Sequence, residues 1–274
     1  MNLFNSIENY KNNIALVSQS TKSITYEQLV IKINDIQKNI PERSLIFLVS
    51  QNSAASLISY ISSIKNNCVV MLVDIKTNIS DISKLITAYE PSFIIAPTDW
   101  MKNYNQKRLK ILQNIYEYSI FKTNYQDSLP MHDDLSVLLP TSGSMGSPKF
   151  VRLSKKNLKS NADSIIKYLD INSTQRAITN MPFNYSYMLS IINTHIESGA
   201  SIFVSKNSVI QKEFWKDFRE NKITSLSGVP YIFEMLIKLG LKNLSTSYLK
   251  TLTHAGGKLD INSTQKIIEF CKEQ

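Results

Sequence analysis

Apolar and polar positions follow a regular order of segments along the first third of the chain. Residues 45–49, 69–73 and 93–96 are apolar throughout, which predicts short strands buried on both faces. Residues 53–64 and 80–89, which lie between these runs, carry apolar side chains at helical spacing. Strands and helices that alternate in this way predict an α/β fold, in which helices cover a largely parallel sheet.

The alternation extends in both directions from this region. Thr25 and Gln28 have the spacing of a capping box, and they predict a helix that ends before Pro41. Beyond a polar linker at residues 122–134, further strands are predicted at residues 135–139, 150–153, 176–180, 201–204, 225–228 and 249–254. Helices are predicted at residues 155–169 (with Ser154 as N-cap), 188–198 (with Gly199 as C-cap), 211–220 and 230–239. We expect two α/β subdomains, residues 1–125 and residues 126–274.

Composition and charge narrow the class of protein. The chain has 274 residues, of which 43% are hydrophobic and 19% charged, as is ordinary for a globular protein. The formal net charge of +9 is spread along the chain without a basic run, which favours a protein that binds nucleotide phosphates over a nucleic-acid binder. No apolar stretch approaches the roughly 20 residues of a membrane span, and the N-terminus lacks a signal-peptide pattern. We therefore expect a cytoplasmic protein with no membrane span and no nucleic-acid partner.

The cysteines and histidines do not form a metal-binding pattern. Cys68 and Cys271 are too far apart in the sequence to indicate a zinc site or a disulfide framework, and their apolar surroundings predict buried thiols. His132, His195 and His254 also lack the spacing of metal ligands. We expect His195 to be a core or boundary residue and assign no metal site.

A loop of small residues between two predicted strands is the strongest candidate for chemistry. Its residues are Thr141, Ser142, Gly143, Ser144, Met145, Gly146 and Ser147, followed by Pro148 and Lys149. Glycines and hydroxylated residues leave backbone N–H groups able to converge on an anion, and the lysine adds a positive charge. The loop is not a Walker A motif, because its Lys follows a Pro and precedes an extended segment. A polyphosphate site and an ordinary surface loop are the two interpretations.

Two further stretches are candidates for a ligand pocket. Residues 181–187 place aromatic side chains beside an Asn and a Ser, which suits either a pocket or a turn with Phe183 and Tyr187 in the core. Residues 255–259 contain a pair of glycines at the end of a predicted strand. Such a pair allows a flat ligand to approach the backbone, although a plain turn has the same composition.

The order of residues 141–149 resembles the phosphate-binding signature of the adenylate-forming ligases, which include acyl-CoA synthetases, peptide-synthetase adenylation domains and luciferases. Met145 departs from the signature, because a hydroxylated residue is usual at that position, and one expected phosphate donor is lost. Residues 24–29, 46–64 and 69–74 are similar to the segments that open this family's fold. The resemblance implies two helix-flanked, largely parallel sheets, as in the N-terminal domain of an adenylate-forming ligase.

The resemblance also implies a reaction and the residues that serve it. Such a ligase uses ATP and Mg²⁺ to convert a small carboxylic acid into an acyl-adenylate, and it passes the acyl group to the thiol of coenzyme A or of a carrier-protein phosphopantetheine. The loop Thr141–Lys149 would bind the ATP phosphates. Asn184, Tyr185 and Ser186 would border the acid pocket, and Gly256, Gly257 and Lys258 would lie near the adenine. No residue is assigned to catalysis itself.

One substitution bears on the acid. Residues 183–186 are similar to the family's Phe-Asp-x-Ser motif, with Asn184 in place of the Asp that meets the α-amino group of an amino-acid substrate. A neutral side chain loses that charge-assisted hydrogen bond. The resemblance therefore favours an acyl or aryl acid over an α-amino acid.

The resemblance matches only about the first half of such a ligase. The sequence stops before the family's aromatic-Gly-x-Thr-Glu motif and before the C-terminal domain, so we expect a truncated AMP-binding domain that is inactive by itself. The alternative hypothesis is a non-catalytic binding protein that retains the scaffold.

Overall fold

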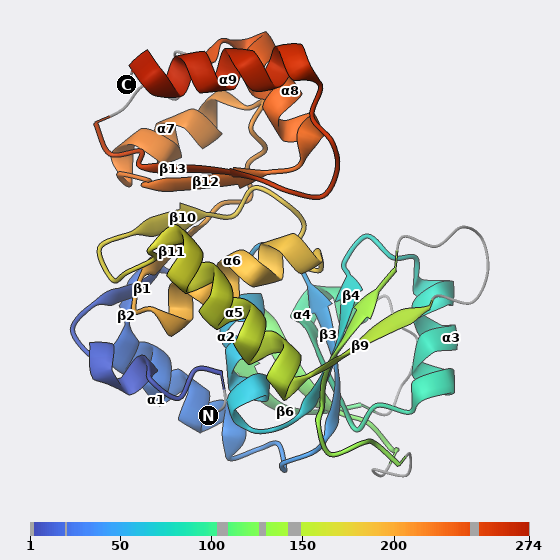
Figure 1. The fold of residues 1–274 in the computed structure, drawn as a ribbon. Helices are drawn as coiled ribbons and strands as arrows, with labels where there is room; N and C mark the ends of the chain where they lie inside the picture. The colour runs from blue at the N-terminus through green and yellow to red at the C-terminus, as the bar shows by residue number, and fades with distance from the viewer. Residues whose placement is uncertain are drawn as a thin grey trace.

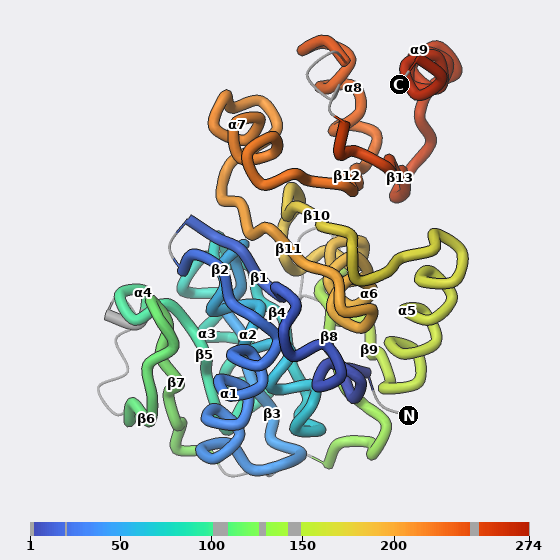
Figure 2. The backbone as a smooth tube through the Cα atoms, turned by 90° about the vertical axis from the view of Figure 1, so that its left-hand side faces the viewer, coloured from blue at the N-terminus to red at the C-terminus, as the bar shows by residue number. Residues whose placement is uncertain are grey.

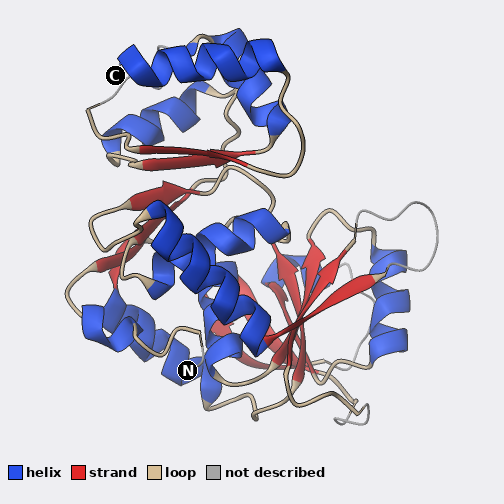
Figure 3. Ribbon diagram, viewed as in Figure 1, coloured by secondary structure: helices blue, strands red, loops and turns tan. Residues whose placement is uncertain are grey.

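The computed structural model describes residues 3–19, 21–102, 109–125, 130–141, 149–241 and 247–273. In this part of the chain, two sheets and their helices form five layers (Figures 1 and 3). The helices are η1 (Ile7–Tyr10), α1 (Tyr26–Gln37), α2 (Ala54–Lys65), α3 (Ile79–Tyr89), α4 (Thr98–Lys102), α5 (Lys155–Leu169), α6 (Ser186–Glu197), α7 (Lys212–Glu220), α8 (Pro230–Leu239) and α9 (Ile261–Glu273). The α/β class with two largely parallel, helix-flanked sheets is confirmed.

The seven-stranded sheet has the order β6-β7-β5-β3-β4-β8-β9. Its strands are β3 (Leu45–Ser50), β4 (Val69–Asp74), β5 (Phe93–Pro97), β6 (Lys110–Ile115), β7 (Tyr118–Lys122), β8 (Leu135–Pro140) and β9 (Phe150–Ser154). The four strands β5, β3, β4 and β8 are parallel, and antiparallel strands flank them on both sides. Phe47 and Val49 of β3 pack toward α3, whereas Ile46 and Leu48 pack toward α1 and α2. Because helices cover both faces, the central strands are apolar at nearly every position, as the sequence predicted; the exceptions include Ser50, Asp74 and Ser136.

The six-stranded sheet has the order β13-β12-β10-β11-β1-β2. Its strands are β1 (Ile14–Ser18), β2 (Lys22–Thr25), β10 (Arg176–Ile178), β11 (Ser201–Val204), β12 (Ser225–Gly228) and β13 (Thr251–His254). Helices α7, α8 and α9 cover its outer face, and α1, α2, α5 and α6 lie between the two sheets (Figures 1 and 2). The five layers are thus α3, the seven-stranded sheet, a central helical layer, the six-stranded sheet and an outer helical layer.

The pairing of strands crosses the boundary that we placed at residue 125. β1 and β2, from the first predicted subdomain, join the six-stranded sheet, because Leu16 pairs in parallel with Ile202. β8 and β9, from the second, join the seven-stranded sheet, where Val137 pairs with Val70. Each sheet therefore contains strands from both halves of the chain.

Residues of α1 and of the segment before it contact α6 and so connect the N-terminal and C-terminal halves of the chain. Thr25 and Gln28 form the capping box that the sequence predicted at its start. The buried hydroxyl of Tyr26 donates to the backbone oxygens at the end of α6, with distances of 2.6 Å to Ala200 and 3.1 Å to Ile196. Gly199 was predicted as the C-cap of α6, but Ser198 holds that position and Gly199 follows it. Gly199 has a φ of +73°, and a Cβ there would lie 2.3 Å from Cδ1 of Tyr10. A side chain at residue 199 would therefore force these elements apart.

Some local expectations need correction. Strands β1, β2, β6 and β7 were not predicted. β2 is a short polar segment that acquires strand character only by pairing, whereas the apolar residues of β1 and β7 are a strand signal that the sequence analysis did not use. Cys68 is buried as expected, but the expectation is wrong for Cys271, since α9 turns Phe270 to the core and leaves the following residue exposed. Among the described residues, no helix is both long and apolar enough to cross a membrane.

Candidate functional site

The glycine- and serine-rich loop connects two antiparallel strands, β8 and β9. At its base, the backbone N–H and the hydroxyl of Thr141 both donate to the carbonyl oxygen of Lys149, at 2.9 and 3.0 Å. Both residues are exposed, and no described carboxylate pairs with Lys149. β9 begins directly after Lys149, which confirms the predicted extended exit. The other proposed phosphate ligands lie outside the described residues: Ser142, Gly143, Ser144, Met145, Gly146 and Ser147.

A cavity of about 550 Å³ lies between helices α5 and α6 and one face of β12 and β13. The strands pair in register, so that Ser225 faces Thr251 and Ser227 faces Thr253. These four hydroxylated residues point to the cavity, because side chains alternate along a strand, and the intervening leucines pack against the outer helices. The helices complete the wall with residues of both kinds, polar and apolar: Asn161, Ile165, Tyr168, Leu169, Ser186, Tyr187, Ser190, Ile191, Thr194 and His195.

A short chain of hydroxyl groups links α6 to this face of the sheet. Tyr187 donates to the Oγ1 of Thr253 at 2.8 Å, and that oxygen lies 2.6 Å from the Oγ of Ser227. Burial raises the pKa of the Tyr187 phenol, so the group is protonated at neutral pH. These hydroxyls fix the distance between the helix and the two strands, and they offer a ligand neutral donors and acceptors.

His195 is buried in the wall of the cavity, with 2% of its surface exposed. Its Nδ1 lies 2.9 Å from the carbonyl oxygen of Ile191, which can only accept, so Nδ1 carries the proton. Nε2 is then an acceptor, and among the described residues it has no hydrogen-bond partner. Desolvation lowers the pKa of the imidazole to about 4, against a smaller opposing effect of the bond to Ile191. The expected core histidine is therefore neutral, and it is satisfied at one nitrogen only.

The cavity brings together some of the residues that the sequence singled out. Ser186, at the start of α6, and Gly256, just beyond β13, both line it. Asn184 and Tyr185 precede α6 and do not line it; Tyr185 is 48% exposed. Gly257 and Lys258 are exposed beyond the end of β13.

Gly256 leaves bare backbone at the mouth of the cavity. Its φ is +84°, and a Cβ there would lie 3.1 Å from Cγ1 of Val229. A larger residue would therefore be strained and crowded. The absence of a side chain suits the approach of a flat ring, such as a nucleotide base, to the backbone.

Sequence reasoning missed the hydroxyl chain of Tyr187, Ser227 and Thr253. The helix was predicted to begin at Met188, but it begins at Ser186, which moves Tyr187 from a turn onto the helix. A signal was present in the strands, because Ser-Leu-Ser and Thr-Leu-Thr each place two hydroxyls on one face. Their pairing in register was the missing information.

Comparison with known proteins agrees with this fold. The family model of AMP-binding enzymes matches residues 3–273, and the chain belongs to that family. The crystal structure of VinN superimposes with a TM-score of 0.77 at 15% identity, covering 98% of this chain and 71% of VinN. O-succinylbenzoate coenzyme A synthetase (MenE) from Bacillus subtilis, in complex with AMP, gives 0.75 at 15% identity, covering 97% and 70%.

Relatives known by sequence are ligases and synthetases. The D-alanine–D-alanyl carrier protein ligase of Staphylococcus haemolyticus is 21% identical over 93% of this chain and 52% of its own length. The hybrid PKS-NRPS synthetase fsa1 of Fusarium sp. is 22% identical over 92% of this chain and 7% of its own length. The chain thus spans about half of the first relative and a small part of the second.

Proposed function

We propose that this chain forms the acid-binding and ATP-binding part of an adenylate-forming ligase that activates an acyl or aryl acid with no charge other than its carboxylate. The observation that carries the proposal is the cavity beneath α5 and α6, which reaches Gly256 at the end of β13. No Asp, Glu, Lys or Arg is among its described lining residues, and His195 is neutral. A second charge on the acid would be desolvated there without a partner, at a cost of several kcal/mol by the usual order of magnitude.

Two described residues suit a nucleotide. Gly256, at the mouth of the cavity, offers bare backbone to the adenine, and Lys149, outside the cavity lining, offers the phosphates a charge that no described carboxylate pairs with. ATP with Mg²⁺ would supply the leaving group, pyrophosphate, when the acid carboxylate attacks the α-phosphate. We infer that the thiol acceptor is coenzyme A or a carrier-protein phosphopantetheine, and that the loop from Thr141 to Lys149 binds the β- and γ-phosphates.

The names of the relatives indicate which classes of acid similar proteins bind. One of them is a ligase for D-alanine, VinN has been crystallised with L-aspartate, and NpsA of Klebsiella oxytoca with a 3-hydroxybenzoyl analogue. Asn184 precedes α6 and does not line the cavity, so its role rests on the resemblance alone: it stands where the family's motif has the acidic residue that meets an α-amino group. On that ground we place this chain with the acyl and aryl acids. Because the chain spans about half of the carrier-protein ligase, the complete reaction is assigned to the full-length ligase.

The test is acid-dependent exchange of labelled pyrophosphate into ATP, measured on the full-length protein with a panel of acids. We expect acyl or aryl acids to support exchange and α-amino acids to support much less. Lys149→Ala should lower the exchange rate roughly tenfold or more, because a charge-assisted contact to phosphate is lost. Lys156→Ala is the matched control, since Lys156 is an exposed lysine at the start of α5.

Three outcomes would contradict the proposal. Exchange that is unchanged in Lys149→Ala removes the loop from the reaction. A clear preference for α-amino acids removes the inference from Asn184. Acids that bind without any exchange would favour the non-catalytic binding protein instead.

A further inference from the structure

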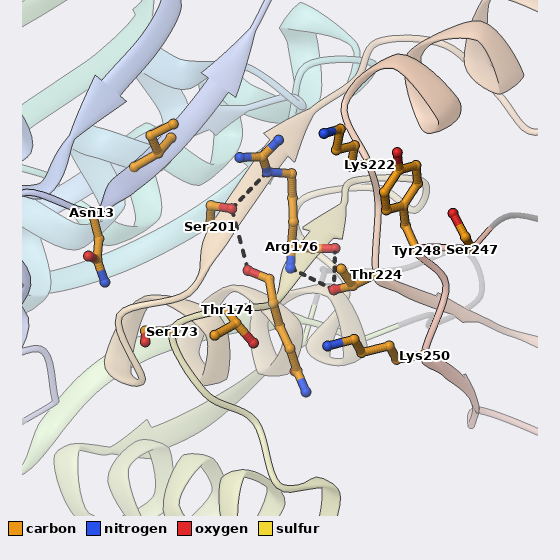
Figure 4. Close-up of a pocket in the computed structure, with 12 residues that line it drawn as sticks. Asn13, Ser173, Thr174, Arg176, Ser201, Lys222, Thr224, Ser247, Tyr248 and Lys250 are labelled. Carbon is orange, nitrogen blue, oxygen red and sulfur yellow. Dashed lines mark hydrogen bonds between the residues drawn. The ribbon is translucent and has the colours of Figure 1, made fainter.

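A second cavity, of about 450 Å³, lies at the opposite ends of the same strands (Figure 4). Arg176 is the first residue of β10 and Ser201 the first of β11, and Thr224 and Lys250 directly precede β12 and β13. The cavity is therefore at the amino ends of the parallel strands, whereas Gly256 lies beyond their carboxyl ends. Gln175 lines both cavities and forms part of the wall between them.

The lining of this second cavity is strongly basic. It has three cations, six hydroxyl-bearing residues and no described carboxylate: Asn13, Ile14, Ser173, Thr174, Gln175, Arg176, Ser201, Lys222, Thr224, Ser247, Tyr248 and Lys250. None of its three cations forms an ion pair within the described part of the chain. The first cavity, between α5, α6 and β12–β13, is proposed above to bind the acid and is called the acid cavity; it has no charged residue in its described lining. The two cavities thus differ in the kind of ligand they can accept.

Arg176 is held in place by neutral groups. Its Nε donates to the Oγ of Ser201 at 2.9 Å, and its Nη1 donates to the carbonyl oxygen of Asn221 at 2.7 Å. Burial lowers the pKa of the guanidinium, which nevertheless stays charged at neutral pH. A partly desolvated cation with unused N–H donors and no carboxylate is stabilised when an anion binds beside it.

The second cation is also positioned. Lys222 has a left-handed backbone (φ +51°), and its ammonium lies 5.3 Å from the centre of the Tyr248 ring. In Figure 4 its amino group points to the side of the cavity where the Arg176 guanidinium lies. Lys250 enters the same cavity from the start of β13. Stacking on the aromatic ring already restricts the lysine side chain, so less conformational entropy is lost when a ligand binds.

We propose that this cavity binds the phosphate group of a small phosphorylated molecule. A phosphate dianion offers several oxygens and two charges, which matches a guanidinium, two ammonium groups and the hydroxyl of Tyr248. The hydroxyls of Ser201 and Thr224 already donate to the carbonyl oxygens of Gln175 and Arg176, and they serve to hold Arg176 in place. The remaining volume and hydroxyls suit a polyhydroxylated carrier of the phosphate, such as a sugar. Among the described lining residues the two cavities share only Gln175, and Thr141 and Lys149 line neither, so the phosphate proposal does not depend on the proposed ligase reaction.

The test uses the full chain and backbone amide NMR with three probes: inorganic phosphate, ribose 5-phosphate and ribose. We expect saturable shifts at Thr174, Arg176 and Thr224 with both phosphates and none with ribose. Amides near Thr141 and Lys149 report binding at the other loop separately. If ribose 5-phosphate binds more tightly than inorganic phosphate, the ligand is an organic phosphate; equal affinities point to free phosphate.

The variant Lys222→Asn/Lys250→Gln removes two charges without touching the hydrogen bonds of Arg176. Asn tolerates the left-handed backbone at residue 222. We expect phosphate binding at least roughly tenfold weaker, because two charge-assisted contacts are lost. The control is Lys32→Gln, which also removes a lysine stacked on a tyrosine, with its ammonium 4.6 Å from the Tyr116 ring, outside the cavity.

Specific results would overturn the proposal. They are the absence of saturable shifts at the cavity, equal shifts with chloride at matched ionic strength, equal binding of ribose, or affinity for phosphate that survives in the double variant.

Discussion

The two sheets of this protein are covered by helices on both faces, yet both cavities described above are lined by strands of the six-stranded sheet. In the seven-stranded sheet, β3 and β4 are apolar on both sides and fully buried along most of their length. In the six-stranded sheet, β12 and β13 are apolar only on the side of α8 and α9, and carry Ser or Thr on the other. Short hydroxylated side chains leave space beneath the central helices that larger apolar residues would fill.

The two sheets therefore differ in role: one mainly stabilises the fold, and the other provides a surface that can bind a ligand. Close packing of large side chains on both faces gives the seven-stranded sheet most of its stabilisation. On the hydroxyl face of β12 and β13 (Ser225, Ser227, Thr251 and Thr253), the side chains are smaller and pack less closely, and they form a neutral, hydrogen-bonding surface. Substitutions in the two sheets should therefore have effects of different size and kind.

The largest effect is expected from Phe47→Ala in β3. Phe47 is fully buried between β4 and α3, so its truncation should lower the free energy of unfolding by about 3–5 kcal/mol. Ser227→Ala in β12 is the comparison, and it should cost only about 1 kcal/mol, the usual contribution of one hydrogen bond. Denaturant unfolding of both variants measures the two losses. Equal losses would mean that the hydroxyl face is as much a packing surface as β3.

An intermediate effect is expected from pH, through His195. Its pKa is lowered to about 4 in the folded protein, from an ordinary value of 6.5, because burial disfavours the charged imidazole. As the pH falls below 6.5, the unfolded chain binds the proton first, so stability is lost until about pH 4 and no further below it. The full change is on the order of 3 kcal/mol.

Denaturant unfolding at several pH values checks this prediction. The loss of stability between pH 6.5 and 4 should be smaller in His195→Gln than in the parent, and unchanged in His132→Gln, which alters an exposed histidine. The same pH dependence in the parent and in His195→Gln would show that the buried imidazole is not the cause.

The smallest effect is expected from Tyr26→Phe, which tests how β1, β2 and α1 are fastened to α6. Loss of the hydroxyl leaves the backbone oxygens of Ala200 and Ile196 without this donor, at a cost of about 1–2 kcal/mol. Tyr116→Phe removes a hydroxyl from a tyrosine that is 42% exposed and should change stability little. A loss no larger in Tyr26→Phe than in Tyr116→Phe would show that packing, and not the hydroxyl, joins these elements.

Much of the seven-stranded sheet could be predicted from the sequence. The apolar runs at β3, β4 and β5 and the helices between them agree with the structure to within one or two residues, because burial on both faces imposes a strong local pattern. β2 could not be predicted in this way, although β1 carries a short apolar run. A segment such as Lys22–Thr25 becomes a strand because β1 lies beside it, and β1 in turn depends on β11, far away in the sequence.

The candidate site was predictable only in part, for the same reason. Ser186 and Gly256 were found through short motifs that can be read locally. The hydroxyl face and the partnerless nitrogen of His195 arise from strand register and from the packing of α6, which no local pattern encodes. The basic cavity likewise assembles residues that each precede or begin a different strand, and its charges are ordinary when read singly.

The parallel pairing of β1 with β11 also has a consequence for synthesis on the ribosome. β1, which contains Leu16, cannot pair with β11 until Ile202 has been synthesised. At about 5–20 residues per second, that wait is on the order of ten seconds. During this time, the early hairpin of β1 and β2 presents an unsatisfied strand edge, a feature that promotes association with other chains.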